Sequence, residues 1–252
     1  MTLEDILDPI SLKTFFTDYW GKQHLILKPD GYHYNIQKFK DIFTFDHLTR
    51  YINRYPDVKS LQILDYDNSG TRWCLDKHKQ LGQPYFDKKQ IVDLWESGKT
   101  IVVPFCEYED EKLVNLCFEF EKYFSRSQVN VYASPCKNSK SFPVHTDNTE
   151  NFLFHTYGKT KWTLYKEFAG KKPKTILEEI ILEEGDLLYI PRHQYHKVET
   201  IEPRILFSIH FHNKDNQSLD RFRITSNEEN YRDKWFNLDP TKVQGNFYVS
   251  ND

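Results

Sequence analysis

From Val129 to Phe211 the sequence alternates between apolar and polar residues, and Gly, Pro and Asn interrupt the alternation at short intervals. Residues 151–157, 161–165 and 204–211 are the clearest strand-like stretches. Successive side chains of a strand point to opposite faces, so this pattern predicts strands with one face in a core. Many short strands separated by turn residues predict a sandwich or barrel. We therefore expect a mainly β fold with flanking helices, a double-stranded β-helix of the jelly-roll kind.

The remainder of the chain is expected to flank this core within one structural domain. Residues 1–128 read as N-terminal helices and strands, residues 129–213 as the core, and residues 214–252 as a C-terminal helix and tail. Apolar residues at helical spacing predict a helix over 109–124, and alternation predicts a strand over 60–66.

An aromatic cluster near the N-terminus bears on the oligomeric state. Ser11 has the position of a helix cap, and the helix that it begins carries a group of large rings, Phe15, Phe16, Tyr19 and Trp20. This group is either part of the core or a dimer face, and we favour the core. We accordingly expect a monomer or a dimer with a small interface.

His145-Thr146-Asp147, followed at a distance by His196, is the motif that carries chemistry. Side chains at positions i and i+2 of a strand share a face, so His145 and Asp147 point the same way. A histidine from a distant strand would complete two imidazoles and one carboxylate on one side of a metal. That donor set is typical of non-haem Fe(II) oxygenases, which keep coordination positions open. We predict that His145, Asp147 and His196 are both the metal ligands and the catalytic centre.

This region resembles the Jumonji-C (JmjC) branch of the cupin-fold oxygenases that use Fe(II), 2-oxoglutarate and O2, and most closely the ribosomal-oxygenase group. The resemblance rests on the metal motif, on residues 129–135 before it, and on the Gly185-Asp186 turn that precedes His196. Residues 15–28 are similar to that group's usual opening. The resemblance implies a third ligand about five residues after Ile190-Pro191, which favours His196 over the rival His193.

The far carboxylate of 2-oxoglutarate needs a fixed cation, and here the sequence departs from the family. JmjC relatives carry a Lys or Arg where this chain has Thr160, and alternation points Lys159 and Lys161 to the opposite face. The prolyl-hydroxylase branch uses an Arg shortly after its second histidine, and Arg204 matches that pattern. An exposed Arg204 at the end of a loop is the alternative.

Other residues are expected to line the pocket. Five are predicted to contact the co-substrate: Tyr132, Asn151, Thr160, Arg204 and Ser208. The relatives imply the role of Asn151, and His155, Trp162 and His210 are further candidates for the lining. The Thr or Ser that several relatives carry three residues before the first histidine is Phe142 here, so that contact is lost.

Composition and charge limit the partners and the cellular compartment that we expect. The net charge of −3 and the absence of a long basic block argue against a nucleic-acid partner, and the Lys171–Lys174 loop reads as solvated. No apolar run is long enough for a membrane span, and the first residues lack a secretory signal. We expect a cytoplasmic protein whose four cysteines, without metal-binding spacing, are reduced and buried.

These observations predict an Fe(II)- and 2-oxoglutarate-dependent dioxygenase that hydroxylates a C–H bond. The expected substrate is a protein, a peptide or a peptide-like small molecule. Thr160 and Phe142 keep open a cupin enzyme that uses a metal without 2-oxoglutarate. A non-catalytic cupin that acts as a binding module is the third reading, against which the intact triad speaks.

Overall fold

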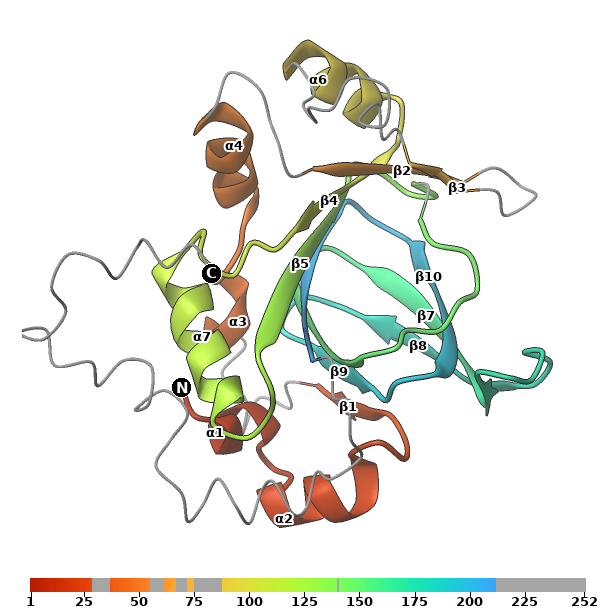
Figure 1. The fold of residues 1–252 in the computed structure, drawn as a ribbon. Helices are drawn as coiled ribbons and strands as arrows, with labels where there is room; N and C mark the ends of the chain where they lie inside the picture. Colours follow the sequence, from red (N-terminus) through yellow and green to blue (C-terminus); the bar gives the residue numbers. More distant parts are fainter. Residues whose placement is uncertain (29–36, 55–60, 67–71, 75–87, 140, 212–252) are drawn as a thin grey trace, which may run out of the picture.

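Two facing antiparallel sheets form the core of the structure, a computed structural model that describes residues 1–28, 37–54, 61–66, 72–74, 88–139 and 141–211 (Figure 1). The strands between Ser127 and Phe211 are β5 (Ser127–Ser134), β6 (Glu150–Tyr157), β7 (Thr160–Phe168), β8 (Ile176–Leu182), β9 (Leu187–Ile190), β10 (Gln194–Thr200) and β11 (Arg204–Phe211). The smaller sheet has the order β10-β7-β8, and it faces β9-β6-β11-β5 of the larger one. This arrangement is the expected double-stranded β-helix.

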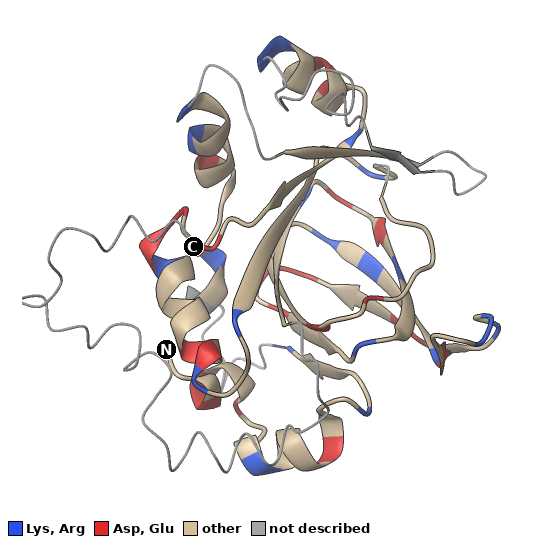
Figure 2. Cartoon of the chain, viewed as in Figure 1, with Lys and Arg blue, Asp and Glu red and all other residues tan. Residues whose placement is uncertain are grey.

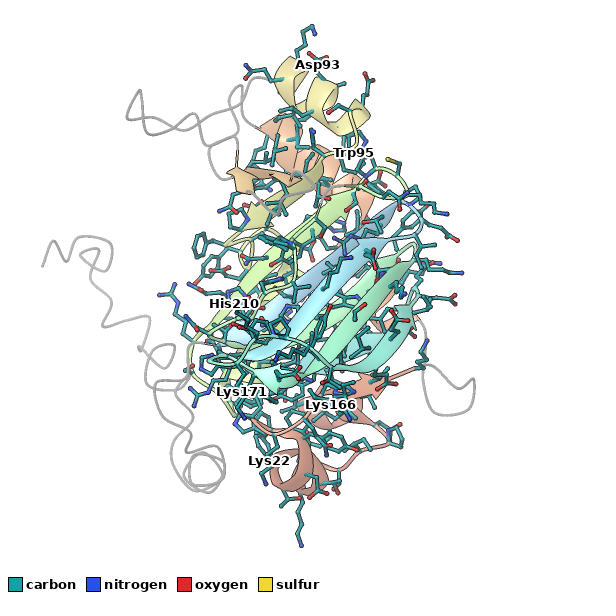
Figure 3. All side chains as sticks on the ribbon, turned by 90° about the vertical axis from the view of Figure 1, so that its right-hand side faces the viewer. Lys22, Asp93, Trp95, Lys166, Lys171 and His210 are labelled. Atoms are coloured by element: carbon teal, nitrogen blue, oxygen red, sulfur yellow. The ribbon has the colours of Figure 1, made fainter. Side chains whose placement is uncertain are left out.

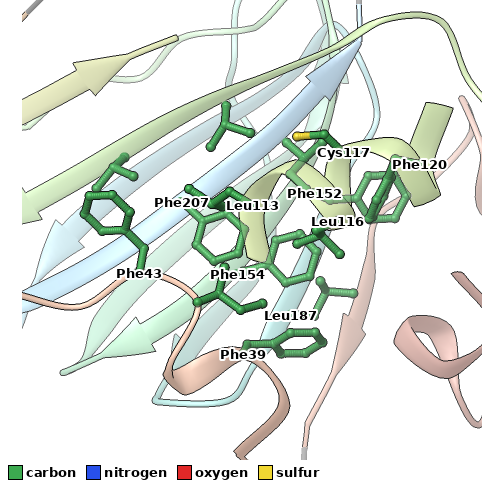
Figure 4. Close-up of a cluster of buried hydrophobic side chains, with 14 of the residues drawn as sticks. Phe39, Phe43, Leu113, Leu116, Cys117, Phe120, Phe152, Phe154, Leu187 and Phe207 are labelled. Carbon is green, nitrogen blue, oxygen red and sulfur yellow. The ribbon is translucent and has the colours of Figure 1, made fainter. Parts of the chain in front are cut away.

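The larger sheet is covered on its outer face by helices. Alternate residues of β6 and β11, such as Phe152, Phe154 and Phe207, point to that face and are fully buried. They pack against helix α7 (Glu111–Glu121) and the segment around Phe39, as Figure 4 shows. The other residues of these strands face the space between the sheets. Because both faces are covered, all eight residues of β11 are buried.

The space between the sheets holds a second, smaller apolar cluster. It is built from both walls: Leu153, Trp162, Leu164, Ile180, Leu182, Leu188, Ile190, Val198 and Leu206. These side chains fill part of the barrel and leave the rest for polar residues. Apolar side chains therefore fill one part of the space between the sheets, and another part is left as a cavity.

The N-terminal segments extend and cover the larger sheet. Its order in the described part is β1-β9-β6-β11-β5-β4-β2-β3, so four strands come from the first 104 residues. These are β1 (Leu25–Leu27), β2 (Gln62–Tyr66), β3 (Arg72–Cys74) and β4 (Thr100–Pro104). The helices are α1 (Leu3–Leu7), α2 (Leu12–Thr14), the π-helix η1 (Phe15–Tyr19), α3 (Gln37–Lys40), α4 (Phe45–Arg54) and α6 (Lys88–Glu96).

Local sequence signals explain several boundaries. The side chain of Ser11 accepts a hydrogen bond from the Thr14 N–H and so caps α2. The helix predicted over 109–124 is shorter, because Asp110 caps α7 by accepting from the Lys112 N–H. Phe15 and Phe16 are fully buried, so the aromatic cluster belongs to the core.

Three further expectations concern the cysteines, the C-terminal segment and membrane spans. Cys106 and Cys117 are buried free thiols, but Cys136 is exposed, which corrects the expectation that all cysteines are buried. The C-terminal helix and tail predicted over 214–252 lie outside the described residues. Within the described part, no helix is long and apolar enough to cross a membrane.

Candidate metal centre and adjoining cavity

His145, Asp147 and His196 come together at one end of the barrel. The ligand atoms that they offer all lie within 4.8 Å of one another. Asp147 Oδ2 is 3.5 Å from His196 Nε2, and Asp147 Oδ1 is 3.7 Å from His145 Nε2. Reciprocal backbone hydrogen bonds join His145 to His196 at the edge of the smaller sheet, with N···O distances of 3.1 and 2.9 Å. The backbone pairing therefore holds the two imidazoles together.

Both imidazoles are oriented by the backbone. His145 Nδ1 lies 2.8 Å from the Pro143 carbonyl oxygen, and His196 Nδ1 lies 3.0 Å from the Gln194 carbonyl oxygen. A proton on Nδ1 satisfies each carbonyl and leaves Nε2 with a lone pair for a metal. Burial lowers the pKa of His196 to about 4, so its ring is neutral at neutral pH. Two imidazoles and one carboxylate suit a divalent metal such as Fe(II).

Asn151 supports the carboxylate of the triad. Its Nδ2 donates to Asp147 Oδ2 at 2.9 Å, and it also lines the adjoining cavity. In this structure Asn151 thus orients the Asp147 carboxylate, a contact that the sequence did not predict. His193, the rival third ligand, is outside the cluster of ligand atoms. Its backbone has a positive φ of 69°, and its N–H donates to the Asp147 carbonyl oxygen.

A cavity of about 360 Å3 adjoins the triad. Its walls come from both sheets and from the segment before His145, and they include the triad together with Tyr132, Ser141, Phe142, Asn151, Trp162, Arg204 and Ser208. Apolar side chains such as Leu153, Ile190, Val198 and Leu206 complete it. This size and mixed lining are typical of a small-molecule site.

Arg204 is the cation of this cavity. It is 1% exposed, and it lies on the inward face of β11 together with Leu206 and Ser208. Its Nε donates to Ser134 Oγ at 3.0 Å and one terminal nitrogen to Ser141 Oγ at 3.4 Å. Burial lowers its pKa to about 10, so it stays protonated at neutral pH. No acidic side chain of the described residues forms an ion pair with it, which leaves its charge available to an anion.

The lysines beside Thr160 point elsewhere. Lys161 pairs with Glu179 at 2.6 Å and Lys159 with Glu183 at 2.8 Å, both at the surface. Thr160 is fully buried, but it is not among the residues that line the cavity. Its hydroxyl accepts a hydrogen bond from Trp162 Nε1 at 3.1 Å. The structure therefore gives Thr160 a partner in the wall instead of a direct contact with the cavity.

The two other histidine candidates also lie outside the lining. His155 is 1% exposed, and neither ring nitrogen has a hydrogen-bond partner among the described residues. Burial, followed by the charge of Arg204, lowers its pKa to about 3. His210 lies on the same strand face as Ser208, at the end of β11. Sequence reasoning missed Ser134 and Ser141, the partners of Arg204. Ser134 follows Tyr132 at the spacing of one strand face, which is the signal that identifies it.

Comparisons with known proteins relate this chain to the JmjC domain and to ribosomal oxygenases. Residues 101–219 match the family model of the JmjC domain. The chain is 25% identical over 218 residues to ribosomal oxygenase 2 of Rattus norvegicus, covering 78% of this chain and 43% of that protein. It is 28% identical over 226 residues to the bifunctional lysine-specific demethylase and histidyl-hydroxylase NO66 of Drosophila erecta, covering 82% of this chain and 32% of that one. The chain thus spans less than half the length of either relative.

Solved structures with the same fold include the ribosomal oxygenase YcfD of Escherichia coli. One, in complex with cobalt and succinic acid, superposes with a TM-score of 0.63 at 17% identity and covers 84% of this chain and 54% of that one. Another, in complex with cobalt and 2-oxoglutarate, has a TM-score of 0.62 and covers 97% and 60%. At this level of identity, the likeness establishes the fold alone.

Proposed function

We propose that the protein is an Fe(II)- and 2-oxoglutarate-dependent oxygenase of the JmjC type, because residues 101–219 match the family model of the JmjC domain. The observation that carries the proposal is the cluster of His145, Asp147 and His196 on the wall of a cavity that also holds a buried arginine, Arg204, which has no acidic partner among the described residues. A metal centre and a cation in one cavity suit a co-substrate that has a chelating end and a carboxylate end. With Fe(II) and 2-oxoglutarate bound, the net reaction converts C–H and O2 to C–OH while 2-oxoglutarate becomes succinate and CO2.

In this proposal the protein supplies ligands and orientation. His145 and His196 bind the metal through Nε2, because their Nδ1 atoms are turned to backbone carbonyls. Asp147 supplies the carboxylate, and Asn151 fixes its rotation. These contacts orient the three side chains that would hold the metal at the wall of the cavity.

Arg204 is proposed to hold the far carboxylate of 2-oxoglutarate. Two of its five N–H donors are used by Ser134 and Ser141, so three remain for a two-pronged pair with a carboxylate. Tyr132 and Ser208, which line the same cavity, are proposed to add hydroxyl contacts. Thr160 contributes indirectly by fixing the Trp162 ring at the cavity wall.

The substrate is proposed to be a protein or peptide side chain, and the protein is proposed to act in the cytoplasm. The relatives named as a ribosomal oxygenase and a histidyl-hydroxylase support a polypeptide substrate. A peptide-like small molecule is the alternative substrate for the same chemistry.

The experiment is succinate formation from 2-oxoglutarate by the Fe(II)-loaded protein in the presence of O2 and a library of peptides. We expect succinate to accumulate and some peptides to gain the mass of one oxygen atom. Asp147→Ala is the matched control, and it should give neither product. Peptide oxidation that proceeds equally without 2-oxoglutarate would contradict the proposal.

A metal-dependent cupin enzyme that does not use 2-oxoglutarate is the second candidate. Thr160 favours it, because the chain lacks a cation at the position where JmjC relatives carry one. The two candidates differ in the need for 2-oxoglutarate in that assay.

A further inference from the structure

The hairpin that joins β7 to β8 lies at the metal end of the barrel. Phe168 pairs with Gln194, two residues before His196, and the Ala169 N–H donates to the His193 carbonyl oxygen at 2.8 Å. Gln194 Nε2 also donates to the Tyr165 carbonyl oxygen at 3.3 Å. The opposite end of the same sheet, where Thr200 pairs with Thr160, is remote from the hairpin. The hairpin is therefore tied to the segment that carries the third proposed metal ligand.

This hairpin carries a local positive charge. Residues 166–174 contain four lysines and one glutamate, a net of +3, in a chain whose net charge is −3. The lysines are Lys166, Lys171, Lys172 and Lys174, and all four are exposed. Figure 2 shows the loop as a blue tip that projects from the smaller sheet, and Figure 3 shows Lys166 and Lys171 on the side of the molecule that this sheet forms.

None of these four lysines is neutralised by an acid of the described part of the chain. On the same sheet, Lys159, Lys161 and Lys197 each form an ion pair with a glutamate, at 2.6–3.0 Å. The only acid of the hairpin is Glu167, whose carboxylate accepts the N–H groups of Lys174 and Thr175 at 3.1 Å each. The hairpin thus differs from its own sheet in leaving its ammonium groups free.

We propose that this basic hairpin docks an acidic segment of the polypeptide substrate next to the metal centre. The inference rests on the proposed function for the identity of the substrate. Lysine is a flexible point charge that pairs with carboxylates without demanding one geometry. The hairpin has no arginine, and its single aromatic ring, Phe168, is half-buried, so it lacks a stacking platform for nucleic-acid bases. The negative charge of the rest of the chain also disfavours a long polyanion.

The spacing predicts where the acidic residues lie in the substrate. Strand residues advance about 3.3 Å each, so the loop lies ~10–20 Å from His196. An extended polypeptide covers that distance in roughly three to six residues. The acidic segment should therefore flank the hydroxylated residue by that number of positions.

The test is binding of a fluorescent Gly-Ser peptide that carries a run of glutamates, measured by anisotropy at low salt. A peptide with glutamines in their place is the ligand control. The triple variant Lys171→Ala, Lys172→Ala and Lys174→Ala should bind the glutamate peptide about 10-fold more weakly than the natural protein, because each exposed ion pair contributes a factor of roughly two to three. The glutamine peptide should bind to neither protein.

The matched control removes equal charge from the helices. Lys13→Ala, Lys89→Ala and Lys112→Ala replace exposed lysines of α2, α6 and α7, and this variant should bind the glutamate peptide within about twofold of the natural protein. Equal losses in the two triple variants would overturn the inference. So would tighter binding of oligouridylate than of the glutamate peptide through the hairpin, which would identify a nucleic-acid partner.

The docking proposal and the proposed function can fail independently of each other. Peptide binding requires no turnover, and succinate formation without peptide should be the same in the hairpin variant and the natural protein. If the natural protein forms no succinate, the oxygenase proposal is wrong. If the hairpin variant binds the glutamate peptide as well as the natural protein does, only the docking proposal is wrong.

Discussion

Arg204→Ala is expected to weaken 2-oxoglutarate binding by about 100-fold, with the metal site intact. Arg204 is buried on the cavity wall, so solvent screens its charge little. Its hydrogen bonds to two serines leave donors for both oxygens of a carboxylate. Two bonds to a charged group contribute roughly 1.5 kcal/mol each or more, about 3 kcal/mol together. At ~1.4 kcal/mol per decade, this corresponds to a factor of about 100.

The assay is anaerobic calorimetric titration of the Fe(II)-loaded protein with 2-oxoglutarate. Arg204→Lys should recover only part of the affinity, because a point charge does not reproduce the two-pronged pair. Lys159→Ala and Lys161→Ala are controls that should change the affinity less than twofold, since both ammonium groups face surface glutamates. A large loss of affinity in Lys161→Ala with none in Arg204→Ala would show that Lys161, and not Arg204, holds the far carboxylate.

Three further perturbations follow from contacts at the site. Asn151→Ala should weaken metal binding about 10-fold in a competition with a chelator, because it removes the hydrogen bond that orients Asp147; unchanged affinity would contradict that role. Gly158→Ala should lower the free energy of unfolding by about 2 kcal/mol or more and weaken 2-oxoglutarate binding, since a Cβ there would meet the Pro203 carbonyl oxygen at 1.7 Å, next to Arg204. Gly170→Ala, at a positive φ with nothing within 4 Å, is the control for backbone strain alone. His155→Gln should reduce the loss of stability on acidification measured by denaturant unfolding at pH 7 and pH 5. The buried His155 stays neutral down to its pKa of about 3, whereas in the unfolded chain the same histidine takes up a proton below about pH 6.5. Between these pH values the free energy of unfolding of the natural protein therefore falls by up to ~1.4 kcal/mol per pH unit.

The strand period explains what the sequence could predict. His145 and Asp147 lie between β5 and β6, so the expectation that they share the face of one strand was wrong, although their ligand atoms do meet. The period of two did put Arg204 on the inward face of β11 and the lysines beside Thr160 outside. The structure has these directions. Alternation along one strand is a local property, so it needs no knowledge of the partner strand.

Individual side-chain contacts could not be predicted from this period. The hydrogen bond from Trp162 to Thr160 depends on a side-chain rotamer, and that from Asn151 to Asp147 depends on the path of the intervening turn. Ser141 reaches Arg204 across 63 residues of chain. The contact between Ser141 and Arg204 depends on how the chain folds in three dimensions, which the periodicity of a sequence does not give.

Direct measurement of Fe(II) stoichiometry tests the central claim most simply. We expect the natural protein to bind one Fe(II) per chain, and the His145→Ala, Asp147→Ala and His196→Ala proteins each to lose most of it. His193→Ala should retain the metal, because its side chain is outside the cluster of ligand atoms. Near-normal iron in the Asp147→Ala and His196→Ala proteins would contradict the metal centre and, with it, the proposed oxygenase.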